Sequence, residues 1–328
     1  MYDVICVGSA TQDVFVSSDQ TRLITIRDPE SEQTYLSYEY GAKLAVDELF
    51  ISTGGGATNT AISFSRMGLS AAVICEVGDD DAGRMIERVL SHENVRTDMM
   101  THNPSLKTGY SVILTGPTGD RTVLVHRGAA CDLTKPEVDW DTVRQTQWLY
   151  LSSLGGDSAC LWSDFAAFAC DHSLKLAINP GSHQIKQGLN ALRPILSVTE
   201  VLFLNNREAC QLTGIEARRG DEDEREALRM LVAAGCKTVV MTMGGEGAMA
   251  YDGIEFHAVP APRVPVVSNL GAGDAFASGC VSALHHGLSL TEALKVATLN
   301  SGSVVGCMNA TDGLLTWERV ATELARHA

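Results

Sequence analysis

The chain has 328 residues, of which 45% are hydrophobic and 20% are charged, a composition typical of a folded globular protein. Lys and Arg number 25 against 40 Asp and Glu, so the formal net charge is −15. Such an acidic chain is unlike a protein that binds nucleic acid nonspecifically or that binds an anionic membrane surface, because phosphate-rich partners are bound through Lys and Arg.

The first part of the chain mixes short apolar runs with β-rich segments. Residues 4–7 are apolar and end at Gly8, which predicts a buried strand. Residues 14–52 have no helical period, and their short runs of β-forming residues predict a small, partly exposed antiparallel sheet. Next we expect a helix over 54–68, a strand over 71–78, a helix over 79–93, and a hairpin over 109–128 with its turn at 116–119.

From about residue 140 the predicted strands and helices alternate. The strands are expected over 147–153, 174–180, 200–206 and 236–245, and the helices over 158–173, 221–235, 271–287 and 289–306. Ser289 and Glu292 form the spacing of a capping box at the start of the last helix. This alternation predicts βαβ units and a mostly parallel sheet. The β-rich insertions at about 14–52 and 106–127 could meet as one accessory sheet.

The nine cysteines include no C-x-x-C pair, and most lie in apolar runs, where a thiol behaves as a small hydrophobic group. We therefore expect reduced thiols and a cytoplasmic protein. The N-terminus lacks the basic and long apolar regions of a signal peptide. No apolar segment reaches the roughly 18 residues of a membrane span, so no membrane partner is expected.

The segment "SNLGAGDAF", residues 268–276, has three interpretations. A dinucleotide fingerprint needs a third glycine where Phe276 stands, and the phosphate loop of P-loop proteins needs a Gly-Lys pair that the chain does not contain. A plain glycine turn before a helix does not explain Asp274. Small residues at a helix start expose N–H groups that bind anions, and a carboxylate beside them suits a general base for phosphoryl transfer.

Several motifs together resemble the ribokinase-like (PfkB) carbohydrate kinase family. "GAGDAF" at 271–276 and "GGGATNTAISFSRMG" at 54–68 resemble its two signatures. "GSATQD", "NNRE" and "TMGGEG" match further family segments in the right order, at 8–13, 205–208 and 242–247. The resemblance covers nearly the whole chain, including the two β-rich insertions.

The resemblance implies an α/β fold, with a three-layer α/β/α arrangement, a mostly parallel central sheet and a small β-sheet lid. It implies one kinase domain over 1–328, with the lid formed by insertions at about 14–52 and 106–127. The implied activity is ATP-dependent phosphorylation of a hydroxymethyl group of a sugar, with Mg²⁺ as the second cofactor.

The implied catalytic residues lie in "GAGD". Asp274 would deprotonate the acceptor hydroxyl, while the backbone N–H groups of Gly271, Ala272 and Gly273 would bind the transferring phosphate.

Other residues are implied to bind the acceptor. Asp13 and Asn59 would hold its hydroxyls, with the backbone of Gly54 and Gly55 close by; the alternatives are a loop turn for Asp13 and a local cap for Asn59. Arg127 could face the acceptor or the transferring phosphate, or be a solvated arginine at a strand end.

The remaining residues are implied to bind ATP. Asn205 and Glu208 would orient phosphates and a hydrated Mg²⁺ without direct metal ligation, since Mg²⁺ keeps several waters. Thr242, Gly244 and Gly247 would line the phosphates and ribose. Asn300 could contact the adenine, or be a structural amide on a helix face.

The chain departs from the family pattern before "GAGD", where Ser268 and Asn269 replace the usual Asp-Thr. That aspartate helps bind a monovalent cation in potassium-activated members, so we expect weak or no potassium dependence. Ribose-specific members carry a glutamate where this chain has "SSLGGD", which disfavours ribose. "INPGSH" likewise replaces the aspartate-containing segment common in many sugar kinases.

Two other functions remain open at this stage. Tyr35, Tyr38 and Tyr40 of the lid could stack on a purine, which would suit an adenosine-type nucleoside kinase. A nucleotide- or sugar-binding protein without catalysis is the other alternative, although the intact "GAGD" argues against it. Exposed sheet edges often pair with a second copy, so a homodimer through the lid is possible.

Overall fold

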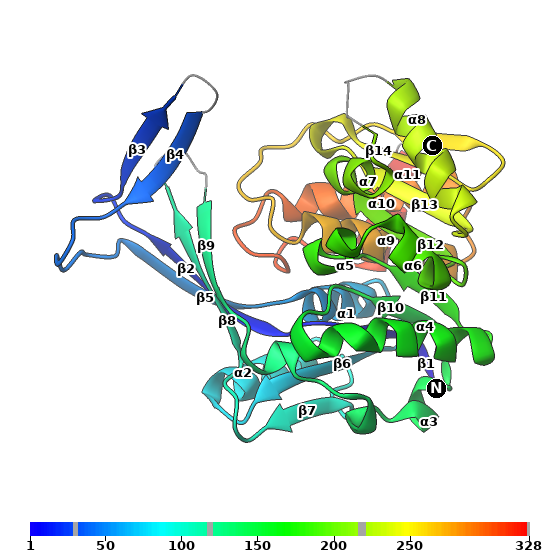
Figure 1. The fold of residues 1–328 in the computed structure, drawn as a ribbon, viewed down its shortest axis with the longest axis horizontal. Coiled ribbons are helices and arrows are strands. Elements are labelled where there is room, and N and C mark those ends of the chain that lie inside the picture. Colours follow the sequence, from blue (N-terminus) through cyan, green and yellow to red (C-terminus); the bar gives the residue numbers. More distant parts are fainter. Residues whose placement is uncertain (29–31, 117–120, 216–220, 327–328) are drawn as a thin grey trace.

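The computed structural model describes residues 1–28, 32–116, 121–215 and 221–326. Within these ranges a nine-stranded sheet has the order β15-β14-β13-β12-β11-β10-β1-β6-β7, and it forms the centre of the molecule in Figure 1. Its strands are β1 (Tyr2–Val7), β6 (Ala71–Gly78), β7 (Met100–Asn103), β10 (Thr146–Leu151), β11 (Lys175–Ile178), β12 (Val201–Asn205), β13 (Thr238–Thr242), β14 (Ala248–Tyr251) and β15 (Phe256–Val259).

Neighbouring strands from β7 to β13 pair in parallel, whereas β14 and β15 pair antiparallel at one edge. The predicted mostly parallel sheet is therefore confirmed. The antiparallel edge hairpin was not predicted, because its strands have only four residues each and no clear alternation.

Helices cover both faces of this sheet. One face packs on α1 (Gly56–Arg66), α2 (Asp81–His92), α9 (Ala272–His285), α10 (Leu290–Val304) and α11 (Trp317–Arg326). The other packs on α3 (Trp140–Val143), α4 (Leu161–Asp171), α5 (Ser182–Gln187), α6 (Leu189–Leu196), α7 (Asn206–Thr213) and α8 (Asp221–Ala233). Two apolar cores separated by the sheet confirm the three-layer α/β/α prediction.

A second sheet projects from the body, at the left of Figure 1. Among the described residues its order is β5-β2-β8-β9, formed by β2 (Thr11–Ser17), β5 (Glu48–Gly54), β8 (Gly109–Thr115) and β9 (Arg121–His126). It thus joins strands from both β-rich insertions. The strands β3 (Arg22–Arg27) and β4 (Glu32–Ser37) form a separate two-stranded sheet at its tip.

The strand pairing in this projecting part differs from the sequence-based prediction. β2 pairs antiparallel with β5 but parallel with β8, so the sheet is mixed and not antiparallel throughout. The parallel pair arises because β2 and β8 each leave the body in the same direction after a central strand. β8 and β9 form the predicted antiparallel hairpin, and its predicted turn at 116–119 lies largely outside the described residues.

Candidate active site

The start of α9 creates a turn that only glycine fits. Gly271, the N-cap residue, has φ +72°, a left-handed conformation that is unfavourable for residues with a Cβ. A Cβ at this position would also lie 2.3 Å from the Cβ of Ala310. The packing therefore holds the backbone of the "GAGD" segment in one conformation.

Gly273 has the opposite environment. Apart from its chain neighbours and the backbone of its own helix, a Cβ at Gly273 would meet nothing within 4 Å, and the residue is exposed. The N–H groups in the first turn of a helix have no intrahelical partner, and they carry the positive end of the helix dipole. The open space at Gly273 is therefore suited to an anionic group, as the sequence predicted for a transferring phosphate.

Asp274 follows directly, in the first turn of α9. Burial raises the pKa of its carboxyl to about 6, and a hydrogen bond from Asn59 opposes this rise. Asn59 donates from Nδ2 to Asp274 Oδ2 over 2.8 Å, although the two residues are 215 positions apart. A carboxylate with this pKa is mostly ionised at neutral pH and still basic enough to accept a proton.

Asn59 itself lies on α1 and is only 6% exposed. Its carbonyl oxygen, Oδ1, is buried without a hydrogen-bond partner. A buried acceptor of this kind costs free energy unless a donor reaches it, and a substrate hydroxyl is such a donor. The Nδ2 group of Asn59 therefore binds the candidate base, and its Oδ1 can accept a hydrogen bond from a substrate hydroxyl.

The turn before α1 brings Asp13 close to these residues. Gly55 has φ +102° and is the N-cap of α1, and its carbonyl accepts from Asn59 N. A Cβ at Gly54 would lie 2.0 Å from Asp13 Oδ2, so the carboxylate packs directly on the Gly54 backbone. Asp13 is 6% exposed, and burial raises its pKa while hydrogen bonds from Ser111 and Thr11 oppose this.

The sequence-predicted acceptor residues Asp13, Gly54, Gly55 and Asn59 therefore form one continuous group that ends at Asp274. Arg127 does not belong to it by any contact among the described residues. It is exposed at the N-cap of a short 3-10 turn, Gly128–Cys131, and its Nη1 lies 3.5 Å from where a Gly155 Cβ would stand. The interpretation of Arg127 as a solvated arginine fits this position better.

A cavity of about 390 Å³ leads from the ends of the central strands to the start of α9. Thr242, Gly244 and Gly247 line one side, where β13 ends, and Ala272 and Gly273 line another. The structure thus brings three of the predicted nucleotide-binding residues and part of the predicted phosphate-binding turn to one cavity. α10 and the segment after β15 complete its wall with Thr298, Ser301, Gly302 and residues 261–264.

A smaller adjoining cavity of about 210 Å³ holds Asn205 and Glu208 together with Thr242 and Gly273. Asn205 and Glu208 form a capping box at the start of α7: Asn205 Oδ1 accepts from Glu208 N, and Glu208 Oε2 accepts from Asn205 N, both over 2.9 Å. Burial raises the pKa of Glu208. A nearby cation would offset that cost, so the pair fits the predicted indirect Mg²⁺ role.

Asn300 does not line the 390 Å³ cavity. It is fully buried, its Nδ2 donates to Ser63 Oγ and Ala275 O, and its Oδ1 accepts from Leu315 N. All its polar atoms are therefore engaged in holding α1, α9, α10 and the C-terminal segment together. The predicted adenine contact is wrong, and the alternative of a structural amide is correct.

Arg121 was missed by the sequence analysis. It begins β9 of the projecting sheet, and its Nη1 donates to Ser268 Oγ in the segment before α9. Both residues line a cleft of about 610 Å³ between the β3-β4 hairpin and residues 266–269. No local pattern distinguishes Arg121 from a surface arginine of a hairpin, because its partner is 147 positions away.

Among the described residues no helix has both the length and the apolar character to cross a membrane.

The sequence pattern of the pfkB family carbohydrate kinases matches residues 6–317. The chain is 30% identical over 274 residues to the aminoimidazole riboside kinase of Salmonella typhimurium, which covers 79% of this chain and 82% of that protein. It is 29% identical over 310 residues to a probable chloroplastic fructokinase-6 of Arabidopsis thaliana, covering 87% and 78% of the two chains.

Solved structures share the fold. The ribokinase of Arabidopsis thaliana complexed with ribose and ATP superposes with a TM-score of 0.82 at 20% identity, over 98% of both chains. The adenosine kinase of Sinorhizobium meliloti gives a TM-score of 0.78 at 22% identity, over 100% of this chain and 99% of that chain. At these identities the likeness shows the fold alone, and it confirms the predicted ribokinase-like arrangement.

Proposed function

The chain belongs to the pfkB family of carbohydrate kinases, and we propose that it transfers phosphate from ATP to a hydroxymethyl group of a sugar with Asp274 as the general base. The observation that carries this proposal is the position of the Asp274 carboxylate. It lies in the first turn of α9, next to Ala272 and Gly273, which line the 390 Å³ cavity. Asn59, on the side proposed for the acceptor, donates a hydrogen bond to it.

In this mechanism the oxygen of the acceptor hydroxyl bonds to the terminal phosphorus of ATP, and Asp274 takes the proton of that hydroxyl. The bond from that phosphorus to the bridging oxygen breaks, and ADP leaves with the electron pair. The N–H groups around Gly271, Ala272 and Gly273 stabilise the charge on the transferring group, since preorganised backbone donors need no reorganisation during the reaction.

ATP is proposed to occupy the 390 Å³ cavity, with its phosphates toward Gly273 and its ribose near Thr242, Gly244 and Gly247. Asn205 and Glu208 are proposed to orient the phosphates and the waters of a Mg²⁺ ion, which would neutralise phosphate charge.

The acceptor is proposed to bind between Asp13 and Asn59. A carboxylate accepts hydrogen bonds from two hydroxyls at once, which suits a polyol. Tyr35 of β4 alternates with Thr34 and Leu36, which line the cleft beneath the hairpin, so its ring points away from that cleft. This orientation gives no support to a purine stacked on Tyr35 within the cleft.

The proposal is tested by measuring ADP release with ATP and Mg²⁺ over a set of sugars, sugar phosphates and nucleosides. A sugar is expected to give the highest rate, and Asp274→Asn is expected to lower turnover by about 10²- to 10⁴-fold. A nucleoside preference would favour the nucleoside kinase alternative, and no ADP with any acceptor would favour a binding protein. Unchanged turnover in Asp274→Asn would exclude this residue as the base.

The region of Ser268 supports the proposal that potassium is not required. Ser268 offers a neutral oxygen where potassium-activated members have a carboxylate, and the guanidinium of Arg121 donates to that oxygen. A fixed positive charge at this point repels a monovalent cation.

A homodimer through the projecting sheet is proposed from its exposed apolar surface. The edge strands β5 and β9 expose apolar side chains at Leu49, Phe50, Ile51, Val123, Leu124 and Val125. Unpaired edges and exposed apolar groups favour pairing with a second copy. Light scattering should give twice the chain mass, and Leu124→Glu, at a residue 56% exposed, should shift the protein toward monomer. A monomeric wild type would contradict the dimer.

All nine cysteines are unpaired in the structure, which supports a cytoplasmic location where thiols stay reduced. The net charge of −15 supports the expectation that nucleic acid is not a partner.

A further inference from the structure

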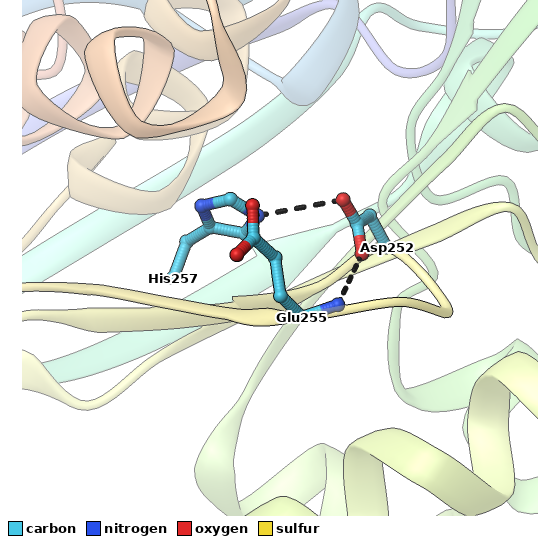
Figure 2. Close-up of side chains that lie close together, drawn as sticks. All are labelled: Asp252, Glu255 and His257. Carbon is cyan, nitrogen blue, oxygen red and sulfur yellow. Dashed lines mark hydrogen bonds and ion pairs between the residues drawn. The ribbon is translucent and has the colours of Figure 1, made fainter.

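The β14-β15 hairpin gathers three side chains with metal-binding groups: Asp252 and Glu255 in its connection, and His257 on β15 (Figure 2). His257 Nε2 lies 3.4 Å from Asp252 Oδ2 and 3.8 Å from Glu255 Oε1. One ligand atom of each residue lies within 4.8 Å of those of the other two. None of the three residues lines the nucleotide cavity or contributes to the site around Asp274.

These separations suit a single transition-metal ion. Zinc binds imidazole nitrogen and carboxylate oxygen at about 2.0–2.2 Å, so neighbouring ligand atoms of a tetrahedral site lie about 3.3–3.6 Å apart. The two distances from His257 Nε2 are close to this range. Glu255 needs the largest adjustment, and its side chain, which is 72% exposed, is free to make it.

The two better buried ligands are held in place by groups outside the set. His257 Nδ1 lies 2.8 Å from Thr291 Oγ1 in the first turn of α10, which fixes the ring and directs Nε2 toward the carboxylates. Metal-binding histidines are typically oriented through their second nitrogen in this way. Asp252 Oδ1 accepts from Ile254 N and Glu255 N over 2.8 Å each, which leaves Oδ2 for the centre of the cluster.

Among the described residues, no arginine or lysine forms an ion pair or hydrogen bond with Asp252, Glu255 or His257. Arg225 and Arg229 of α8 lie nearby in the fold, but they pack over the ring of Phe256. Side chains alternate between the two faces of a strand, so Phe256 and its arginines are on the face opposite to Glu255 and His257. These arginines therefore do not neutralise the two carboxylates of the cluster, which leaves both carboxylates available to a bound cation.

We propose that Asp252, Glu255 and His257 form a binding site for one divalent transition-metal ion of the zinc class, with water completing its coordination. An imidazole ligand favours such a metal over Mg²⁺ or Ca²⁺, which prefer oxygen ligands alone. The ion would link the connection of the β14-β15 hairpin, through Asp252 and Glu255, to His257 on β15, which contacts α10. The chain after β15 and α10 both line the nucleotide cavity, so a bound ion would stabilise this part of the cavity wall.

The test measures metal binding to the purified, metal-free full chain under reducing conditions, and it does not depend on kinase activity. Titration calorimetry with Zn²⁺ gives the stoichiometry and affinity, and Co²⁺ absorption identifies the ligand type, since the exposed thiols of Cys160 and Cys170 could also bind metal. The variants are His257→Gln and Glu255→Gln; the latter changes an exposed side chain and should not affect folding. His102→Gln is the matched control, because His102 pairs with the single carboxylate of Glu87 over 3.5 Å.

We expect one ion per chain in the wild type, a Co²⁺ spectrum of nitrogen and oxygen ligands without a thiolate charge-transfer band, and a Zn²⁺-dependent rise in Tm. Affinity should fall at least about tenfold in Glu255→Gln and be lost in His257→Gln, as expected when ligands of a metal site are removed, while His102→Gln binds like the wild type. The proposal is overturned if the wild type binds no ion, if the spectrum shows sulfur ligation, or if both site variants bind as tightly as the wild type.

Discussion

Replacing Asn59 by leucine removes the 2.8 Å hydrogen bond from its Nδ2 to Asp274 Oδ2 and keeps a side chain of similar size. The pKa of Asp274 is raised by burial to about 6, and the Asn59 hydrogen bond opposes that rise. Its loss removes a donor from the ionised form, so the pKa of the base should rise further. The acidic limb of the pH profile should move to higher pH.

The size of this shift follows from the hydrogen bond. A hydrogen bond to a charged group is worth about 1.5–3 kcal/mol, and one pKa unit corresponds to about 1.4 kcal/mol, so the limb should move up by about one to two units. At pH 6.5 the ionised fraction of the base would then fall about three- to 25-fold. By about pH 9 most of this deficit disappears, because the carboxylate is ionised in both proteins.

The assay is kcat/KM against pH from 5 to 9, using the acceptor that releases most ADP. A deficit that remains at pH 9 and lies in KM for the acceptor would report the loss of Asn59 Oδ1 as a hydroxyl partner. An unchanged acidic limb in Asn59→Leu would refute the reasoning, since Asn59 would then not affect the base. An acidic limb that persists in Asp274→Asn would assign that ionisation to another group.

Three further outcomes test other parts of the molecule. Gly271→Ala should lower the free energy of unfolding in urea by at least about 2 kcal/mol, because the backbone at this position is left-handed and a Cβ would clash with Ala310. Gly273→Ala should lower that free energy by less than about 0.5 kcal/mol but should still reduce turnover. Equal losses of stability in the two variants would contradict this prediction. With Ser268 in place, exchanging sodium for potassium at fixed ionic strength should leave activity unchanged, and a many-fold rise would disprove it. Arg66→Gln breaks the part-buried ion pair with Glu93 and should lower the free energy of unfolding by about 2 kcal/mol at neutral pH. The hydrogen bond from Arg66 lowers the pKa of the Glu93 carboxyl, so this loss of stability should shrink as the pH falls and Glu93 is protonated. A loss that does not depend on pH would argue against the ion pair.

The signals that the sequence carried well are local ones. The capping box of Ser289 and Glu292 is present as predicted, because its hydrogen bonds join residues three positions apart. The "GAGD" turn begins α9 at Gly271 and places Asp274 in its first turn, as the sequence predicted. Strand and helix alternation likewise predicted the three-layer arrangement.

Features with weak local signals were missed or misread. The β14-β15 hairpin has strands too short for a clear period, and it forms the edge where the candidate metal site lies. The separation of β3 and β4 from the other projecting strands could not be predicted either. Which strands of a β-rich segment pair is decided by where the chain leaves the central sheet, and no short segment contains that information.

The sequence by itself determined the family, the layered fold and the identity of Asp274 as the candidate base, because each rests on a short motif or a repeating pattern. Only the tertiary structure decided what surrounds that base. Asn59 reaches Asp274 across 215 positions, and Asn300, which looked available on a helix face, is instead buried with every polar atom engaged. The physical reason is that hydrogen bonds within a turn depend on neighbours in the chain, whereas burial and long-range contacts depend on the order in which strands and helices pack.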